Sequence, residues 1–324
     1  MRVLVTGSAG HLGESLLRRL REHGHDAVGL DVLDAPDTVV GSIVDRECVR
    51  RCVAGVDAVV HAATLHKPHI ESHTRGEFVA TNVTGTLILL EESVAAGVER
   101  FVFTSSTSAF GRALMPPAGA PAVWITEEVI DVPRNIYGVT KSAAEDLCEL
   151  THRDRGLAVV ILRTSRFFPE GDDRDDVRSA YLDDNVKVNE LLYRRVDLED
   201  VLSAHELALE RAPELGFGRY IISATTPFSR EDLADLRTDA RAVVKRLFRH
   251  YESIYAARGW TMFPSIERVY VNDRARRDLG WSPRYDFAHA LDRLAADQEW
   301  RSPLAVSVGA KGYHPFSHGV YTTR

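Results

Sequence analysis

A glycine-rich turn follows the first apolar run of the chain, in the segment VLVTGSAGHLGESLL. The run at 2–6 has the composition of a buried strand, and the pattern at 12–23 is that of a helix. Gly7, Gly10 and Gly13 allow a tight turn and let a phosphate approach bare backbone at the start of that helix. The segment therefore predicts a dinucleotide site, although a glycine triplet alone is a weak signal.

Strands and helices alternate through the first half of the chain. Strands are expected at 2–6, 26–31, 57–61, 100–104, 158–163 and, later, 218–224. Helices are expected at 12–23, 46–54, 76–96 and 137–155. Nearly continuous apolar strands such as AVVH and FVFT indicate burial on both faces. The pattern predicts an α/β fold with a Rossmann-type, doubly wound parallel sheet, followed by a smaller, mainly helical substrate region.

The chain has 324 residues, which suits a large domain with a smaller part appended. We expect residues 1–163 and about 186–224 to form the nucleotide-binding domain. Residues 164–185 and 225–324 are then the substrate-binding region.

Composition narrows the classes of partner and compartment. A net charge of -7 leaves no basic surface for nucleic acid or an anionic membrane, so neither is an expected partner. No apolar run is as long as a membrane span, and the N-terminus shows no signal-peptide pattern. Three cysteines are too few for a disulfide scaffold. A cytoplasmic protein with a small-molecule substrate is the simplest interpretation.

Tyr137 and Lys141 lie one helical turn apart in NIYGVTKSAAEDL, on the same helix face. A nearby ammonium group favours a phenolate, so we expect this pairing to lower the tyrosine pKa toward working pH. Such a tyrosine can exchange a proton with a substrate hydroxyl. The segment RFVFTSSTSAFG supplies a third element, because it leads from the strand at 100–104 into a hydroxyl-rich loop.

Together these segments resemble the extended short-chain dehydrogenase/reductase family, in particular its nucleotide-sugar epimerase/dehydratase branch. The resemblance rests on GSAGHLG at 7–13, Asp31, HAA at 61–63, Asn82 in TNVTGT, SST at 105–107 and YGVTK at 137–141. It is close over roughly the first half of the chain and looser beyond. It implies a catalytic set in which Ser106 holds the substrate oxygen, Tyr137 takes the proton and Lys141 binds the nicotinamide ribose. Ser105 and Thr107 are the alternatives for the serine if the register slips.

Asp31 ends the second strand, where its carboxylate can bind both ribose hydroxyls and repel a 2′-phosphate. The next residue, Val32, is not the arginine that would accept that phosphate, so NAD rather than NADP is the expected cofactor. The residues expected to contact it are Gly7, Ala9, Gly10, His11, Leu12, Gly13, Asp31, Ser42, Ile43, His61, Ala62, Ala63, Asn82, Thr104, Tyr137 and Lys141.

The resemblance also implies that the segment LRTSRFFPE contacts the substrate. The substrate-binding residues expected from this segment and the neighbouring loops are His66, Ser106, Thr107, Arg163, Arg166 and Arg174. The three histidines of LHKPHIESH lack a carboxylate-backed ligand pattern, so no metal is expected.

The net reaction stays open between several alternatives. The short stretch from Pro169 to VDLEDV at 196–201 and the R-x-x-x-x-x-P-E pattern at 163–170 are similar to those of uronate dehydrogenases, which oxidise free sugar acids with NAD. The sequence STSA at 106–109 replaces the Asp-Glu pair of the family's dehydratases. We expect an NAD-dependent oxidoreductase or epimerase acting at a secondary hydroxyl of a sugar or nucleotide sugar. Net oxidation of a free sugar acid, or of another small hydroxy or keto compound, is the alternative.

A non-catalytic NAD-binding regulator is a third hypothesis, which the intact Ser-Tyr-Lys set disfavours. The resemblance further implies a homodimer, in which the helices 76–96 and 137–155 pair across a two-fold axis. Their apolar stripes are wider than one sheet face requires and include Leu87, Leu89, Leu90, Val94, Val139, Ala143, Leu147 and Leu150.

Overall fold

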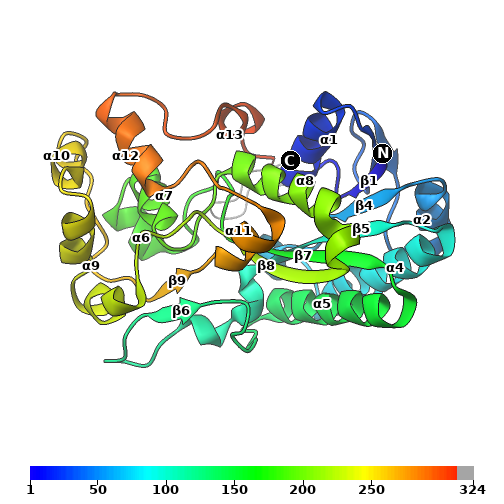
Figure 1. The fold of residues 1–324 in the computed structure, drawn as a ribbon, viewed down its shortest axis with the longest axis horizontal. Coiled ribbons are helices and arrows are strands. Elements are labelled where there is room, and N and C mark those ends of the chain that lie inside the picture. Colours follow the sequence, from blue (N-terminus) through cyan, green and yellow to red (C-terminus); the bar gives the residue numbers. More distant parts are fainter. Residues whose placement is uncertain (312–324) are drawn as a thin grey trace.

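The computed structural model describes residues 1–311. Its larger lobe is built on a seven-stranded parallel sheet (Figure 1). Its strands are β1 (Arg2–Thr6), β2 (Asp26–Asp31), β3 (Thr38–Val40), β4 (Ala58–His61), β5 (Arg100–Ser106), β7 (Ala158–Thr164) and β8 (Phe217–Ile222). They are arranged in the order β3-β2-β1-β4-β5-β7-β8. From β1 the chain adds strands in one direction, then returns to β4 and adds strands in the other. This is the doubly wound arrangement that the alternation predicted.

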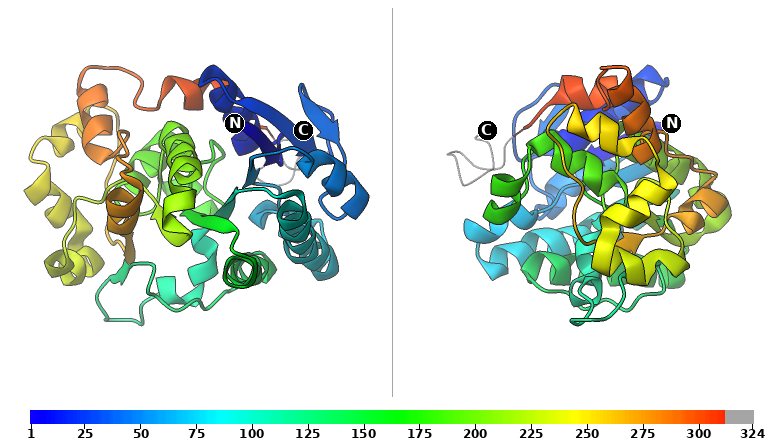
Figure 2. Two further views of the ribbon diagram at one scale, coloured as in Figure 1. Left: turned by 45° about the vertical axis from the view of Figure 1, so that its right-hand side comes forward. Right: turned by 90° about the vertical axis from the view of Figure 1, so that its left-hand side faces the viewer.

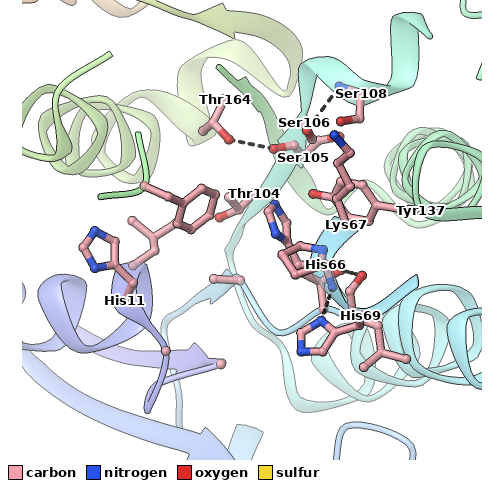
Figure 3. Close-up of a pocket in the computed structure, with 18 of the residues that line it drawn as sticks. His11, His66, Lys67, His69, Thr104, Ser105, Ser106, Ser108, Tyr137 and Thr164 are labelled. Carbon is pink, nitrogen blue, oxygen red and sulfur yellow. Dashed lines mark hydrogen bonds between the residues drawn. The ribbon is translucent and has the colours of Figure 1, made fainter. Parts of the chain in front are cut away.

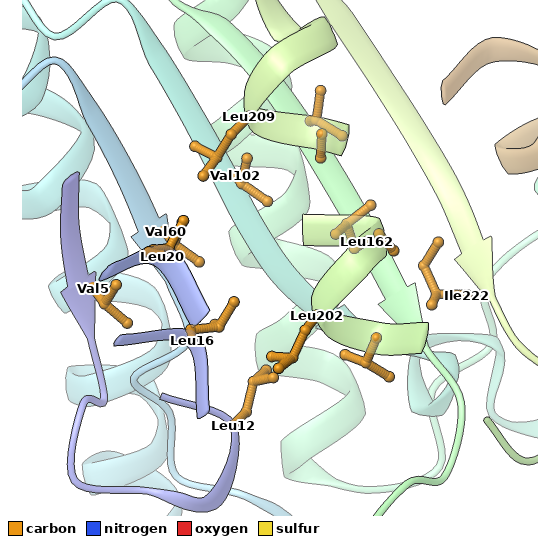
Figure 4. Packing of buried hydrophobic residues seen from close by; sticks show 14 of the residues in the cluster. Val5, Leu12, Leu16, Leu20, Val60, Val102, Leu162, Leu202, Leu209 and Ile222 are labelled. Atoms are coloured by element: carbon orange, nitrogen blue, oxygen red, sulfur yellow. The ribbon is translucent and has the colours of Figure 1, made fainter. Parts of the chain in front are cut away.

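Helices cover both faces of this sheet. They are α1 (His11–Glu22), α2 (Arg46–Val53), α3 (Arg75–Val79), α4 (Gly85–Ala96), α5 (Ile136–Arg155), α8 (Leu198–Leu215), α11 (Asp273–Leu279) and α13 (Pro303–Val308). Because side chains of a strand alternate between faces, Val3 and Val5 pack with α1 and α8, whereas Leu4 packs with α2, α4 and α5. Figure 4 shows the first of these two cores, with Leu16 of α1 and Leu202 of α8 beside the strands.

The helix expected at 76–96 is interrupted. After α3 the backbone forms a π-helical turn, Ala80–Thr84, before α4 begins. Asn82 lies in this turn, and its side chain accepts from the Leu65 amide at 2.7 Å and donates to the Leu65 carbonyl at 3.0 Å. It also donates to the Thr140 hydroxyl of α5 at 3.0 Å. The turn therefore ties the loop after β4 to α5, in keeping with the frequent occurrence of π turns at functional sites.

A second lobe lies beside the sheet and has its own apolar core (Figure 2). It contains a small parallel sheet of β6 (Val123–Ile125) and β9 (Arg268–Tyr270), and the helices α6 (Asp175–Ala180), α7 (Asp183–Leu191), α9 (Leu233–Leu247), α10 (Tyr251–Ala256) and α12 (Phe287–Ala295). Short 3-10 turns lie at Lys67–Glu71, Thr107–Phe110, Arg112–Leu114 and Arg230–Asp232.

The packing of α7 bears on the expected division of the chain. Val186, Val188 and Leu191 are buried in the core of the second lobe, and α7 contacts α12. Residues 186–193 thus pack with the C-terminal helices, although we had placed them in the nucleotide-binding domain. Residues 312–324, the end of the predicted substrate region, lie outside the described residues. Within residues 1–311, no helix combines the length and the apolar character needed to span a membrane.

Candidate active site

A cavity of about 700 Å³ opens at the carboxyl ends of the parallel strands. Gly7 follows β1, Asp31 ends β2, Ala62 follows β4, Ser106 ends β5 and Thr164 ends β7, and all five line it. In doubly wound sheets, ligands bind at the carboxyl edge where the strand order reverses, here between β1 and β4. The fold therefore brings the sequence-predicted segments to one place.

The glycine turn after β1 shapes one end of the cavity. Gly7 has a φ of 73°, which favours glycine, and a Cβ on Gly13 would lie 2.0 Å from the Gly7 carbonyl oxygen. Only glycine at these positions lets α1 start this close to the strand. Gly10 caps α1 without a side-chain hydrogen bond, so the first amide groups of the helix are not capped by a side chain. An uncapped helix N-terminus beside a cavity fits an anionic group such as a pyrophosphate.

The carboxylate of Asp31 lies at the same end. One oxygen accepts from the Ala9 amide at 3.0 Å and the other from the Leu33 amide at 2.9 Å. Each carboxylate oxygen can accept more than one hydrogen bond, so both retain capacity for a ribose hydroxyl. These contacts fix the orientation of Asp31 relative to the glycine turn, as a ribose-binding carboxylate requires.

Tyr137, near the start of α5, faces the Ser106 hydroxyl at the other end of the cavity (Figure 3). The Ser106 hydroxyl is close enough to the phenol to lower its pKa. The Ser106 oxygen also accepts from the Ser108 amide at 3.1 Å, which holds the side chain at the turn after β5. Lys141 lies behind the tyrosine, where its Nζ donates to the Thr104 carbonyl at 2.6 Å.

Burial controls the ionisation of these groups. It raises the pKa of Tyr137, which the Ser106 hydroxyl partly offsets. The direction is opposite to the lowering that we expected from Lys141, since removal from water penalises the phenolate. Burial likewise lowers the pKa of Lys141 to about 7, against the opposing charge of Glu145. The lysine thus titrates near neutral pH. The Tyr137 phenol stays protonated there unless a nearby positive charge stabilises the phenolate.

Most of the predicted contact residues line the cavity. They are Gly7, Ala9, Gly10, His11, Leu12, Gly13, Asp31, Ser42, Ile43, Ala62, Ala63, His66, Thr104, Ser106, Thr107, Tyr137 and Arg166. His61 is elsewhere, since its buried ring bonds the hydroxyls of Thr6 at 2.7 Å and Thr86 at 2.9 Å. The side chain of Asn82 makes its hydrogen bonds with Leu65 and Thr140, as described above. Both have structural roles here.

Arg163 was predicted to bind substrate, but the structure places it outside the cavity. Its guanidinium is almost fully buried between two carboxylates, with Nη2 at 2.6 Å from both Asp131 and Glu145. It also stacks over the Phe110 ring at 4.6 Å. All three of its nitrogens bond Asp131 or Glu145, and Arg163 is not among the residues that line the cavity, so the structure does not place it where the prediction requires.

Arg174 also lies outside the cavity, because its exposed side chain pairs with Asp176 on α6. Arg166 does line the cavity, and its Nη1 lies 2.7 Å from Asp172 and 3.5 Å from the buried Glu190. Burial alone would raise the pKa of Glu190, yet the surrounding arginines lower it to about 2. Arg166 is therefore held in place as a cation at the cavity wall.

Sequence analysis missed several residues of the second lobe that line the cavity. Arg268 and Tyr270 come from β9, and Arg194 precedes the segment VDLEDV. A three-residue strand has no periodicity to detect, so no local signal marks β9. Phe167 and Phe168 also line the cavity. Their position in LRTSRFFPE, shortly after the end of β7, is a sequence signal that could have located them.

Comparison with known proteins identifies the family. The profile of the NAD dependent epimerase/dehydratase family matches residues 3–214, well over half of the chain. The chain belongs to this family. This confirms the resemblance inferred from the motifs, and with it an enzyme that uses NAD. The uncapped turn at α1 and the carboxylate of Asp31 fit that cofactor.

Relatives of this epimerase/dehydratase-family protein have diverse names. It is 28% identical to the UDP-glucose 4-epimerase of Azospirillum brasilense, over 96% of this chain and 95% of that protein. It is 26% identical to the 3-beta-hydroxysteroid dehydrogenase of Mycolicibacterium neoaurum, over 90% and 89%. Two further curated relatives match over less than half of their own length.

Among solved structures, a short-chain dehydrogenase/reductase superfamily protein of Agrobacterium tumefaciens with bound NAD is 25% identical. It superimposes with a TM-score of 0.64 over 91% of this chain and 96% of that chain.

Proposed function

We propose that this family member removes hydride from the carbon that carries a secondary hydroxyl of a sugar or nucleotide sugar, using Ser106, Tyr137 and Lys141. The observation that carries the proposal is that Ser106 and Tyr137 lie side by side at the wall of a cavity that the glycine turn also lines (Figure 3). A hydroxyl carbon placed against this pair would share one cavity with a cofactor whose pyrophosphate lies at the glycine turn.

The chain's own residues account for the proton. Tyr137 accepts it from the substrate hydroxyl, while Ser106 holds the substrate oxygen in line. The chemistry that NAD supplies when bound is uptake of a hydride from the carbon that carries the hydroxyl. Because burial raises the tyrosine pKa, proton transfer depends on positive charge close to the phenol. Lys141 supplies it in its protonated form, which burial confines to pH values up to about 7. This ammonium has three donors, so the bond to Thr104 leaves others for a ribose hydroxyl.

The cavity wall supports a substrate with an anionic group. Four arginines line it: Arg134, Arg166, Arg194 and Arg268. Arg194 pairs with Glu190 at 2.6 Å, but the closest carboxylate ion pair of Arg268 is at 3.9 Å, to Glu267. Arg268 is also mostly buried, and its Nε has no hydrogen-bond partner among the described residues. A substrate phosphate or carboxylate in the cavity would pair with the Arg268 guanidinium. Both a nucleotide sugar and a free sugar acid carry such a group.

The test separates these alternatives. The purified protein is stripped of nucleotide, resupplied with NAD, and incubated with nucleotide sugars, free sugars and sugar acids. Growth of NADH absorbance indicates net dehydrogenation, and isomer formation without net NADH indicates epimerisation. We expect turnover of at least one anionic sugar and its loss in Tyr137→Phe. Absence of turnover across the panel, with NAD binding intact, would favour the regulator hypothesis.

A further inference from the structure

Residues 309–311 cross the first turn of α1, beside the glycine turn. The His11 Nδ1 lies 2.8 Å from the carbonyl oxygen of Gly309, and the Lys311 ammonium pairs with the Glu14 carboxylate. The helix before this segment, α13, contacts both α1 and α8, and its Val308 is buried in the core. Residues 309–311 are therefore anchored from both sides at the cofactor end of the cavity.

Lys311 itself lines the cavity together with Gly10 and His11. Its partner Glu14 is shared, because Arg18 pairs with the same carboxylate one helical turn further on. Two cations thus share the single carboxylate of Glu14, so this carboxylate is not the exclusive partner of Lys311. Burial lowers the pKa of His11 to about 4, so the imidazole is neutral near pH 7 and Lys311 supplies the charge on the cavity side.

These observations bear on the chemical group that the α1 N-terminus faces. The uncapped amides of this helix and the glycine turn suit a pyrophosphate. An ammonium at the same wall adds a charge-assisted hydrogen bond to such an anion. We propose that residues 309–311 lie over the bound cofactor. Lys311 is then a further NAD-binding residue, and its ammonium group pairs with the pyrophosphate.

The variant that tests this is Lys311→Met, which keeps the aliphatic stem and removes the charge. Arg18→Met is the matched control, because it removes the other cation bound to Glu14 from a side chain outside the cavity. We expect Lys311→Met to raise the dissociation constant of NAD by about tenfold in calorimetry, the size of one charge-assisted hydrogen bond. Arg18→Met should leave it unchanged within about twofold.

Two further ligands show which part of NAD depends on Lys311. ADP-ribose, which retains the pyrophosphate, should lose affinity for Lys311→Met as NAD does, whereas adenosine, which has no phosphate, should not. Lys311→Arg should restore most of the NAD affinity, and thermal unfolding without cofactor should show that all variants are folded. The proposal is overturned if Lys311→Met binds NAD as wild type does. It is also overturned if Arg18→Met weakens NAD equally, or if adenosine binding falls in parallel.

Discussion

The ring of His66 stands edge-on to that of Tyr137, with 4.9 Å between the ring centroids. His66 is the second titratable ring beside the proposed reaction centre, and burial lowers its pKa to about 3. It is therefore neutral at working pH and a weak base. Neither the positive charge that favours the Tyr137 phenolate nor efficient proton abstraction can come from it. The ring instead forms part of the wall around the phenol, together with Phe168 at 4.7 Å.

The first prediction concerns Tyr137→Phe, which removes the proton acceptor and keeps the ring. Turnover on the substrate found by the screen should fall by about 10²–10⁴-fold, the usual contribution of general acid–base catalysis. NAD affinity should change little, because the hydroxyl is not part of the glycine turn or the ribose carboxylate. Steady-state kinetics and calorimetry measure the two effects. A near wild-type rate would mean that another group takes the proton.

As part of the same test of the catalytic set, Ser106→Ala should reduce turnover less than Tyr137→Phe, because Thr107 also lines the cavity and can offer a hydroxyl. Ser105 cannot substitute in the same way, since its hydroxyl donates to the buried Glu145. The double variant Ser106→Ala, Thr107→Val should therefore lose clearly more activity than Ser106→Ala alone. Equal rates for the single and double variants would remove Thr107 from this role.

A second prediction concerns the choice of cofactor. If Asp31 binds the adenosine ribose, NAD should bind at least about tenfold more tightly than NADP, because a 2′-phosphate would meet the carboxylate. Asp31→Ser should narrow that ratio mainly by weakening NAD. Calorimetry with both nucleotides measures it. Equal affinities for the wild-type protein would refute the role of Asp31.

A third prediction concerns Arg163, which holds two carboxylates inside the protein. Arg163→Met should lower the free energy of unfolding by up to about 3–5 kcal/mol, because it removes the buried cation between Asp131 and Glu145 and leaves Glu145 with Arg219 alone. The exposed pair of Arg174 and Asp176 provides the control, and Arg174→Met should change stability by less than about 1 kcal/mol. Urea unfolding compares the two. Similar small effects would return Arg163 to the list of candidate substrate ligands.

Sequence analysis succeeded where the signal was local. The buried strands β1, β4, β5 and β7 are continuous apolar runs, and their expected bounds agree with the structure to within a residue or two. It failed for strands whose formation depends on pairing with a segment far away in the sequence. β3, β6 and β9 have three residues each and exist because a neighbouring strand is already in place.

The candidate site divides in the same way. The glycine turn and the Tyr137 segment could be located because a short stretch of sequence carries the whole arrangement. The role of Arg163 could not be inferred, since its partners Asp131 and Glu145 come from other segments of the chain. Lys311 was equally hidden, because only the packing of α13 brings it to α1.

A fourth prediction concerns the buried ammonium of Lys141, whose pKa burial lowers from 10.5 to about 7. Between these two pH values the unfolded lysine holds a proton that the folded one has released, so wild-type stability rises with pH. Below about pH 7 both states are protonated and the folded protein carries the full cost of the buried charge. Lys141→Met should therefore be more stable than wild type at pH 6, and its advantage should shrink as the pH approaches 10.

Denaturant unfolding at several pH values measures this difference, and Lys245→Met is the control because Lys245 is exposed beside Glu252. The control should show no pH-dependent difference from wild type. Lys141→Met should also lose NAD affinity if the ammonium binds the ribose, so stability and binding should change in opposite directions. Lower stability than wild type at pH 6 would contradict the argument.

The last prediction concerns a homodimer through α4 and α5. Leu89 and Leu90, which we had counted in the apolar stripe, are buried against the sheet and cannot contribute to an interface. Val139 and Leu150 of α5 remain, with 49% and 41% of their surface exposed. Exposed apolar residues on α5, which packs beside α4, are what a helical dimer interface would cover.

We expect light scattering to give a dimer mass at micromolar concentration. Val139→Glu and Leu150→Glu should each shift the protein toward monomer, because a carboxylate would lose its water on association. Val306→Glu is the matched control, since Val306 is 46% exposed but lies on α13, which packs against α1 and α8 rather than on α5. It should leave the mass unchanged. A monomer mass for the wild-type protein, or dissociation by Val306→Glu alone, would show that α4 and α5 do not form the interface.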